Sequence, residues 1–406
     1  MKITVAVFFG GKSTEHDISC ISANQAIHAI NTEKYDVLPV YISRDQEFYI
    51  GEELMDLGNY YSFINNPESV LTKVKIYKDG TKVYVEPVKK SLLSFKDERK
   101  TIDVAFPVVH GTNVEDGTLA GFLQMLDLPY TSCDVLGGAV GQDKAIMKSI
   151  FKAEGIPMVD YFVVHAGDFE DNYKEYLAKA KEIGFPLIAK PANLGSSIGI
   201  EVIKTQKVFK EKIEECLKYD FKVVVEHMVE ELQEVNISVL GNIDNNRVSV
   251  IEDVTSGSDM LDFSEKYLGG GKGSKGTKAG VKTGTKSFNK TGASQGMAST
   301  SRKFPADITP EQKKTVEEVA VKAFRALNSH GCVRIDFMVD KKNGQVYCNE
   351  INTIPGSLAF YLWKEVGLDF EQECEELIRN ALTRYGKKAK MSYTFDSSVL
   401  EGYRKK

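Results

Sequence analysis

Two apolar segments near the C-terminal end of the chain carry residue types that could bind a metal ion. We predict strands over residues 332–340, CVRIDFMVD, and 345–356, QVYCNEINTIPG, joined by the turn KKNG. Because side chains alternate across a strand, polar residues two positions apart share a face. Four polar side chains therefore converge between the two strands: Arg334, Asp336, Glu350 and Asn352.

Two carboxylates and an amide in apolar strands need compensation, because burying unpaired polar groups is costly. Oxygen ligands suit a hard cation, Mg²⁺ or Mn²⁺, which usually works together with nucleotide phosphates. The alternative is a buried cluster of ion pairs between the arginine and the two acids, without a metal. The residues alone leave both interpretations open.

A second candidate site follows another predicted strand. The segment AKPANLGSSIG, residues 189–199, places Lys190 at the strand end and then a turn of small residues. The backbone N–H groups of such a turn could wrap phosphates, and the lysine would neutralise them. A Gly/Ser turn between two strands is also a common hairpin connection, so this pattern alone is weakly specific.

The elements that must position these residues alternate between strands and helices, which predicts an α/β fold. A strand over residues 3–9 leads through a glycine pair into a helix, where Glu15 either caps the helix or binds a ligand. A chain of 406 residues exceeds what one core usually serves. We expect three domains, with the boundaries 1–139, 140–227 and 228–406.

Composition limits the class of protein. The six cysteines are scattered without a CxxC pair, which is typical of small core residues in a reducing compartment. The apolar part of the N-terminal strand is too short for a signal peptide, and no run approaches about 18 apolar residues. We therefore expect a soluble cytoplasmic protein with no membrane partner. The net charge of -5 gives no general attraction to nucleic acid.

One segment differs sharply in charge from the rest of the chain. Residues 268–304 contain eight Lys or Arg, nine Gly and no acid. The segment has few apolar residues and no helical or strand period, so we expect a flexible loop. It is either a disordered insertion or a basic cover over phosphates.

Eight segments of the chain stand in an order that is similar to one known family. They are FFGGKSTEHDISCISA, VVHGTNVEDGTLAGFLQMLDLPYTS, QDKAIMKS, LIAKPANLGSSIGI, VVVEHMV, LDFSEKY, RIDFMV and NEINTIPG. Together they resemble the D-alanine:D-alanine ligases of the ATP-grasp superfamily, over most of the chain outside residues 51–100, the basic segment and the tail. The resemblance implies a three-domain ATP-grasp fold with an N-terminal Rossmann-like domain, and ATP between the central and C-terminal sheets.

The same resemblance implies a nucleotide and metal site. Two Mg²⁺ or Mn²⁺ ions would bind to Asp336, Glu350 and Asn352 and bridge the ATP phosphates. The residues that would contact ATP are Lys144, Lys190, Gly195, Ser196, Ser197, Glu226, His227, Val229 and Glu234. Within this set the lysines would meet the phosphates, Glu226 to Val229 the adenine, and Glu234 the ribose.

For the amino-acid substrates, the resemblance implies five catalytic residues: Glu15, His110, Ser196, Tyr267 and Arg334. Glu15 would meet the ammonium of the first D-alanine, and Arg334 would stabilise the developing oxyanion. His110 would lie near the first substrate, or it is a hydrogen-bonded structural residue. ATP would phosphorylate the first D-alanine, and the amine of the second would attack the acyl phosphate to give D-alanyl-D-alanine for peptidoglycan precursors.

Two departures from the family pattern concern the lid and the acceptor. The basic segment, which follows Tyr267, is far longer than the usual lid loop. In the family, the run at this place contains a serine that binds the carboxylate of the second substrate. Here the run is SLAFYLW, residues 357–363, and Tyr361 falls near the position of that serine. Either the acceptor pocket is altered, or Tyr361 or a neighbouring backbone N–H binds the same carboxylate.

Other functions remain open at this point. The acceptor could be D-serine or D-lactate, or the chain could be another ATP-grasp dipeptide ligase. A non-catalytic nucleotide-binding regulator is disfavoured because the predicted metal ligands are all present, together with Lys190 and Arg334. A nucleic-acid role for the basic segment is disfavoured because it lacks interleaved aromatic residues. The resemblance further suggests a homodimer whose partners are otherwise small molecules.

Overall fold

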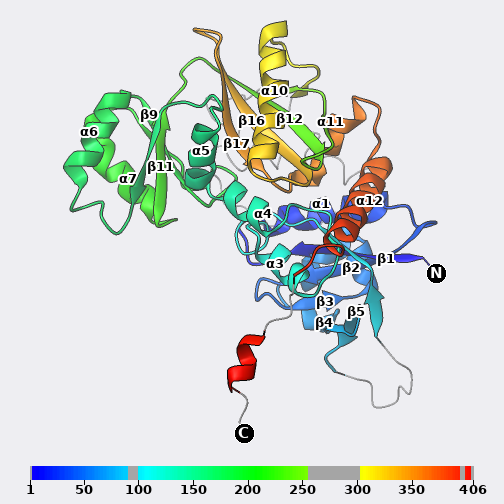
Figure 1. The fold of residues 1–406 in the computed structure, drawn as a ribbon. Coiled ribbons are helices and arrows are strands. Elements are labelled where there is room, and N and C mark those ends of the chain that lie inside the picture. Colours follow the sequence, from blue (N-terminus) through cyan, green and yellow to red (C-terminus); the bar gives the residue numbers. More distant parts are fainter. Residues whose placement is uncertain (1, 90–98, 255–301, 394–397, 404–406) are drawn as a thin grey trace, which may run out of the picture.

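The computed structural model describes residues 2–89, 99–254, 302–393 and 398–403 of the chain (Figure 1). These residues form three β-sheets with helices packed against them, which confirms the predicted α/β class. The domain boundaries at 139/140 and 227/228 stay predictions.

The first sheet has seven strands in the order β6-β5-β4-β3-β2-β1-β7. Strand β1, which lies between β2 and the edge strand β7, pairs in parallel with both, and its last six residues are buried. Parallel strands are covered on both faces, which is why this one is almost continuously apolar. The strands are β1 (Ile3–Gly10), β2 (Tyr35–Ile42), β3 (Phe48–Ile50), β4 (Thr72–Asp79), β5 (Lys82–Pro87), β6 (Lys100–Ile102) and β7 (Val104–Pro107).

Helices of the N-terminal half lie beside this sheet and lead towards the second one (Figure 1). They are α1 (His16–Ala29), α2 (Tyr60–Phe63), α3 (Thr118–Met125) and α4 (Val135–Gln142). The N-terminus of α4 is capped by Asp134, whose side chain accepts a hydrogen bond from the backbone N–H of Gly137.

The second sheet is smaller and antiparallel, with the strand order β10-β9-β11-β8. Its strands are β8 (Tyr161–His165), β9 (Leu187–Pro191), β10 (Glu201–Ile203) and β11 (Lys222–His227). The neighbouring helices are α5 (Lys144–Ala153), α6 (Tyr173–Ile183) and α7 (Phe209–Leu217). The Gly/Ser turn predicted after Lys190 connects β9 to β10, so it is a hairpin connection in this sheet.

The third sheet carries the strand pair that the sequence singled out. Its order is β15-β14-β12-β16-β17, with β13 paired to β12. Its strands are β12 (Leu232–Gly241), β13 (Asn246–Val248), β14 (Glu252–Val254), β15 (Arg302–Lys303), β16 (Gly331–Asp340) and β17 (Val346–Asn352). Its helices are α10 (Pro310–Ala326), which begins with a capping box of Thr309 and Gln312, and α11 (Phe360–Lys364).

Two expectations for this sheet are corrected. The second predicted strand, 345–356, ends at Asn352, because the following residues Thr353 and Ile354 leave the sheet to donate hydrogen bonds to Glu115. The basic segment was expected to be loop throughout, but Arg302 and Lys303 near its end pair with β14. Residues 268–301 lie outside the described part of the chain.

The last long helix returns to the first sheet. Helix α12 (Phe370–Lys388) lies beside α1 in Figure 1, and its residues Cys374, Leu377 and Ile378 belong to the same core as β1. The C-terminal part of the chain therefore closes the N-terminal core. This long-range contact has no local signal in the sequence.

All six cysteines are buried and unpaired, which confirms that they are core residues. Among the helices of the described residues, none has both the length and the apolar composition needed to cross a membrane.

Candidate active site

A cleft between the second and third sheets, which Glu15 at the start of α1 also lines, contains most of the predicted site residues. Its walls come from α5, the β9–β10 turn, β11, β12, β14, β16 and β17. Of the predicted site residues, the cleft is lined by Glu15, Lys144, Lys190, Gly195, Ser196, Ser197, Glu226, His227, Val229, Glu234, Arg334, Asp336, Glu350 and Asn352. His110 is not among the lining residues, and Tyr267 lies outside the described part of the chain.

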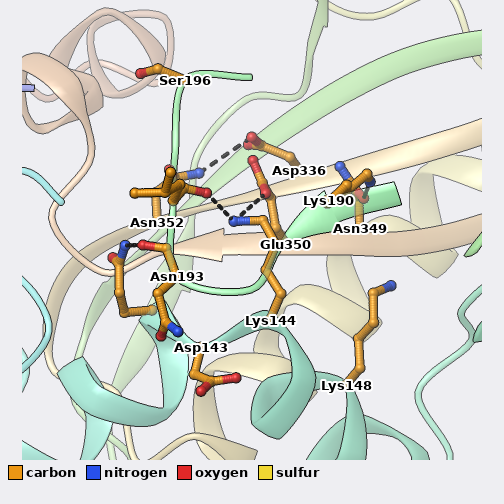
Figure 2. A network of polar contacts seen from close by, with 12 residues as sticks. Asp143, Lys144, Lys148, Lys190, Asn193, Ser196, Asp336, Asn349, Glu350 and Asn352 are labelled. Atoms are coloured by element: carbon orange, nitrogen blue, oxygen red, sulfur yellow. Dashed lines mark hydrogen bonds and ion pairs between the residues drawn. The ribbon is translucent and has the colours of Figure 1, made fainter. Parts of the chain in front are cut away.

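The strand pair β16–β17 brings its four polar side chains together, as alternation predicts. Arg334 pairs directly with Asn352, and Asp336 pairs directly with Glu350. Arg334 donates from Nε and Nη2 to the two carboxylate oxygens of Asp336, at 2.7 and 2.9 Å. The amide of Asn352 donates to Asp336 Oδ2 at 3.3 Å, as Figure 2 shows. The ion pair and the converging oxygen ligands are thus parts of the same cluster.

The donor set of this cluster fits a hard divalent cation. Asp336, Glu350 and Asn352 supply only oxygen ligands, which Mg²⁺ and Mn²⁺ prefer. No group of three or more His, Cys, Asp or Glu in the described ranges is arranged to hold a metal by itself. A cation here would therefore depend on the Asn352 amide and on oxygen atoms of a bound phosphate, which is the usual situation for Mg²⁺.

Two lysines approach the cluster from the second sheet and its helix (Figure 2). Lys144 is the first residue of α5, and its Nζ lies 3.4 Å from Glu350 Oε2 and donates to the carbonyl of Leu194 at 2.8 Å. Lys190, on β9, donates to Asn349 Oδ1 at 3.1 Å. Two ammonium groups beside the carboxylates give this end of the cleft the positive charge that phosphates require.

A buried ion-pair group lies below Lys190. Glu226 of β11 contacts Lys190 with one carboxylate oxygen and Lys148 with the other, at 2.9 Å for Lys148. The side chains of Lys148 and Glu226 are each 1% exposed. Burial would raise the pKa of Glu226, but the two ammonium groups outweigh it and hold the pKa at about 2. Burial would lower the pKa of Lys190, but Glu226 and Glu350 raise it.

Sequence reasoning missed Lys148. Its signal was its place four residues after Lys144 in α5, because side chains at that spacing project from the same face of a helix. An apolar wall, also missed, faces these charges: Ile188, Met228, Leu232, Phe337 and Met338. An apolar wall beside a carboxylate and a few convergent polar groups is the common form of a small-molecule pocket.

The turn between β9 and β10 reaches across to the first sheet. Ser196 and Ser197 have φ values of 54° and 59°, in the left-handed region that residues with a Cβ rarely adopt. Ser196 donates a hydrogen bond from Oγ to Glu15 Oε1. A Cβ on Gly195 would approach Glu15 Oε2 to 2.9 Å, so a side chain at this position would displace the Glu15 carboxylate.

Glu15 occupies the N-cap position of α1 but makes no capping hydrogen bond with its side chain. The carboxylate instead faces the cleft and the β9–β10 turn. Of the two interpretations that the sequence allowed for Glu15, the structure therefore excludes the cap.

His110 lies behind the cleft in a buried hydrogen-bond network. Its Nδ1 lies 2.9 Å from the carbonyl of Ile354, and its Nε2 lies 3.1 Å from Ser22 Oγ. Burial lowers the pKa of this imidazole, and the opposing effect of the nearby Glu15 carboxylate is smaller. The imidazole thus ties the segment after β17 to α1, as expected for a hydrogen-bonded structural residue.

Glu115, which sequence reasoning also missed, likewise holds the segment after β17 in place. Its Oε1 accepts from Thr353 Oγ1 at 2.9 Å and from the Ile354 N–H at 2.8 Å, and its Oε2 accepts from the Gly111 N–H at 2.8 Å. Burial raises the pKa of Glu115 to about 7. Because Thr353 and Ile354 lie more than 230 positions away in the sequence, only the tertiary structure reveals these two contacts.

Comparisons with known proteins show the family of the chain. A family model described as the D-ala D-ala ligase N-terminus matches residues 4–133, and one described as the D-ala D-ala ligase C-terminus matches residues 150–295 and 289–379. The chain is 34% identical to a D-alanine–D-alanine ligase of Thermosipho melanesiensis over 98% of each chain. It is also 34% identical to one of Bacillus cytotoxicus over 97% of this chain and 99% of the relative.

Two solved structures have the same fold. The D-alanine–D-alanine ligase from Coxiella burnetii superimposes with a TM-score of 0.75 at 25% identity, covering 96% of each chain. The VanG D-Ala:D-Ser ligase from Enterococcus faecalis superimposes with a TM-score of 0.72 at 27% identity, covering 94% of this chain and all of that one. The predicted ATP-grasp fold is confirmed by these structures.

Proposed function

The chain belongs to the D-alanine–D-alanine ligase family, and from this premise we propose that it joins two D-alanines with the use of ATP. The observation that carries the proposal is the cleft itself. It combines a carboxylate for an ammonium group, lysines for phosphates and an oxygen ligand set for a divalent cation. The product, D-alanyl-D-alanine, would serve as a peptidoglycan precursor.

The nucleotide would bind between the second and third sheets. Lys144 and Lys190 would contact the phosphates, together with the turn residues Gly195, Ser196 and Ser197. Glu226, His227 and Val229 would meet the adenine, and Glu234 the ribose. The ion pairs of Glu226 support this arrangement, because they fix the carboxylate and Lys190 before ATP enters.

Two Mg²⁺ or Mn²⁺ ions, when bound, would offset the negative charge of the phosphates during transfer. Asp336, Glu350 and Asn352 would hold them. Arg334 would stabilise the oxyanion of the tetrahedral intermediate, because its guanidinium has five N–H donors and only part of them are used on Asp336.

The first D-alanine would be held at the other end of the cleft. Glu15, oriented by Ser196, would meet its ammonium. We propose that Tyr267 completes this set and that His110 acts on the first substrate through the segment after β17 rather than by contact. Water must be excluded, because the acyl phosphate would otherwise hydrolyse.

We further propose that the protein is located in the cytoplasm, forms a homodimer and has no nucleic-acid or membrane partner. The location is supported by six buried, unpaired cysteines, which suit a reducing compartment.

A second candidate function is the ligation of D-alanine to D-serine or D-lactate. It is favoured by the unusual Tyr361 in the cleft and by the similarity to a D-Ala:D-Ser ligase. The test of both functions is mass analysis of the products after incubation with ATP, Mg²⁺ and D-alanine, alone and with D-serine or D-lactate. D-alanyl-D-alanine as the main product supports the proposed function. A mixed product, or ATP hydrolysis without this dipeptide, supports a different acceptor.

A further inference from the structure

A lysine that the roles given above do not use lies below the nucleotide end of the cleft. Lys148 is on the buried face of α5, its side chain is 1% exposed, and it does not line the cleft. Figure 2 shows its side chain directed from α5 towards Lys190. Because a lysine is almost never fully buried unless it is paired, its partner must explain the position.

The partner of Lys148 is Glu226, which also pairs with Lys190. Lys148 Nζ lies 2.9 Å from Glu226 Oε2, and Lys190 Nζ contacts Glu226 Oε1. The Tyr161 ring covers Lys148, with its centroid 5.5 Å from Nζ. Against the effect of burial, the two ammonium groups hold the pKa of Glu226 at about 2, so the carboxylate is ionised at neutral pH. The three side chains are therefore a buried group of two cations and one anion.

The charge of this group determines what Lys190 can offer to a ligand. Lys190 lines the cleft, and its ammonium has three N–H donors, of which the contacts with Glu226 and Asn349 use two. With Lys148 present, the group carries one net positive charge. Without it, Lys190 and Glu226 would neutralise each other. A neutral pair attracts a triphosphate much less than a net positive charge does, above all in a buried site of low dielectric constant.

We infer that Lys148 is a positioning residue for the nucleotide: it is the permanent counter-ion of Glu226, and it leaves the charge of Lys190 available to the phosphates of ATP. The inference rests on the proposed function and deepens it, because it explains how one lysine serves both a buried carboxylate and a ligand. Lys148 acts through Glu226, since it does not line the cleft itself. The alternative is a purely structural ion pair, which would stabilise the fold without favouring phosphates.

The test separates recognition of the phosphates from recognition of the base. Two probes are titrated calorimetrically in the presence of Mg²⁺: AMP-PNP, a non-hydrolysable analogue of ATP, and adenosine, which has no phosphates. The wild type is compared with Lys148→Met, with the double variant Lys148→Met/Glu226→Gln and with the control Lys152→Met. Lys152 lies in the last turn of the same helix, is exposed and does not line the cleft.

The expected result is a selective loss of affinity for the phosphates. Lys148→Met should weaken AMP-PNP binding roughly 10- to 100-fold, the range for losing one interaction with a charged group, and adenosine binding less than about threefold. The double variant removes the carboxylate together with its counter-ion, so Lys190 again contributes one net positive charge. Its ratio of adenosine to AMP-PNP dissociation constants should therefore return to within about threefold of the wild-type ratio. The control should change neither affinity.

Three results overturn the inference. The first is an unchanged AMP-PNP affinity in Lys148→Met. The second is an equal loss of AMP-PNP and adenosine affinity, because Lys148 would then shape the pocket and not its charge. The third is a double variant that binds AMP-PNP, relative to adenosine, no better than Lys148→Met does.

The double variant also decides the question if Lys148→Met does not fold. A wild-type ratio of the two dissociation constants then supports the inference, and a ratio about tenfold lower overturns it. Failure of the proposed function is seen separately, as a wild-type protein that binds AMP-PNP but forms no D-alanyl-D-alanine.

Discussion

The two ends of the cleft are stabilised by different interactions. At the nucleotide end, Glu226 lies between Lys148 and Lys190, and all three stand on regular elements of the second sheet and α5. At the acceptor end, Tyr361 follows an irregular turn that is held by two neutral hydrogen bonds: the Ser357 N–H donates to Ser22 Oγ, and Cys332 Sγ donates to the Leu358 carbonyl.

This difference has an energetic consequence. Removing one partner of a buried ion pair leaves an uncompensated charge, whereas removing a neutral hydrogen bond costs about 1 kcal/mol. We therefore expect substitutions at the nucleotide end to reduce stability, and substitutions at the acceptor end to change amino-acid kinetics with little loss of stability.

The largest effect on catalysis is expected for the proposed metal ligands, which lie between the two ends of the cleft. Asp336→Asn should lower kcat/KM by about 10³-fold, because a metal ligand that contributes several kcal/mol to transition-state stabilisation is lost. The measurement is steady-state kinetics at saturating Mg²⁺, with Asp340→Asn at the end of the same strand as the control. A loss below about tenfold would contradict the metal assignment and favour the ion-pair cluster.

A large loss of stability is expected from Lys148→Met. Among the described residues it leaves Lys190 as the ion-pair partner of the buried Glu226, which should lower the free energy of unfolding by about 3 kcal/mol. The measurement is urea denaturation, with Lys152→Met on the exposed side of α5 as the control.

The charge of Glu226 provides a check on this interpretation. The pKa of Glu226 is depressed to about 2 in the folded state, so its ion pairs stabilise the protein above the unfolded pKa of about 4.5, and this stabilisation is lost as the pH falls towards 2. The difference between wild type and Lys148→Met should therefore shrink over this window. A difference that stays constant from pH 5 to pH 2.5 would mean that the lysine acts through packing alone.

The opposite pH dependence is expected for Glu115, which lies behind the acceptor end. Burial raises its pKa to about 7, with Glu15 adding to the effect, against hydrogen bonds from Gly111, Ile354 and Thr353 that lower it. Its stabilising contribution is therefore complete below about pH 4.5 and is lost as the pH rises through 7. Relative to Glu115→Gln, the wild type should lose on the order of 3 kcal/mol of unfolding free energy between pH 4.5 and pH 8. Parallel stability curves for the two proteins would show that Glu115 titrates normally.

The smallest effect is expected for Ser22→Ala. This change removes the acceptor for the Ser357 N–H and a partner of His110, which should cost about 1 kcal/mol of stability. It should raise the second-site KM for D-alanine about threefold and leave the KM for ATP unchanged. Equal changes in both constants would mean that the two ends of the cleft are not independent. Ser19→Ala, at another buried serine of α1, is the matched control.

Sequence patterns predicted the parts of the site that lie on single strands. Alternation in β16 and β17 was enough to bring Arg334, Asp336, Glu350 and Asn352 together, because the period of a strand fixes which side chains share a face. The same reasoning located Lys190 at the end of β9. It failed at the end of β17, where Thr353 and Ile354 leave the strand and donate hydrogen bonds to Glu115 of a distant loop.

The sequence by itself determined the α/β class, the polar strand pair and the similarity of eight segments to one family, since these depend on residues that are close along the chain. Only the tertiary structure decided that Lys148 neutralises Glu226, that Glu115 and His110 hold the segment after β17, and that α12 completes the N-terminal core. The physical reason is that a buried charge or a strained turn is stabilised by whichever groups the fold brings next to it. These partners lie on other elements, up to several hundred residues away, where no local pattern can indicate them.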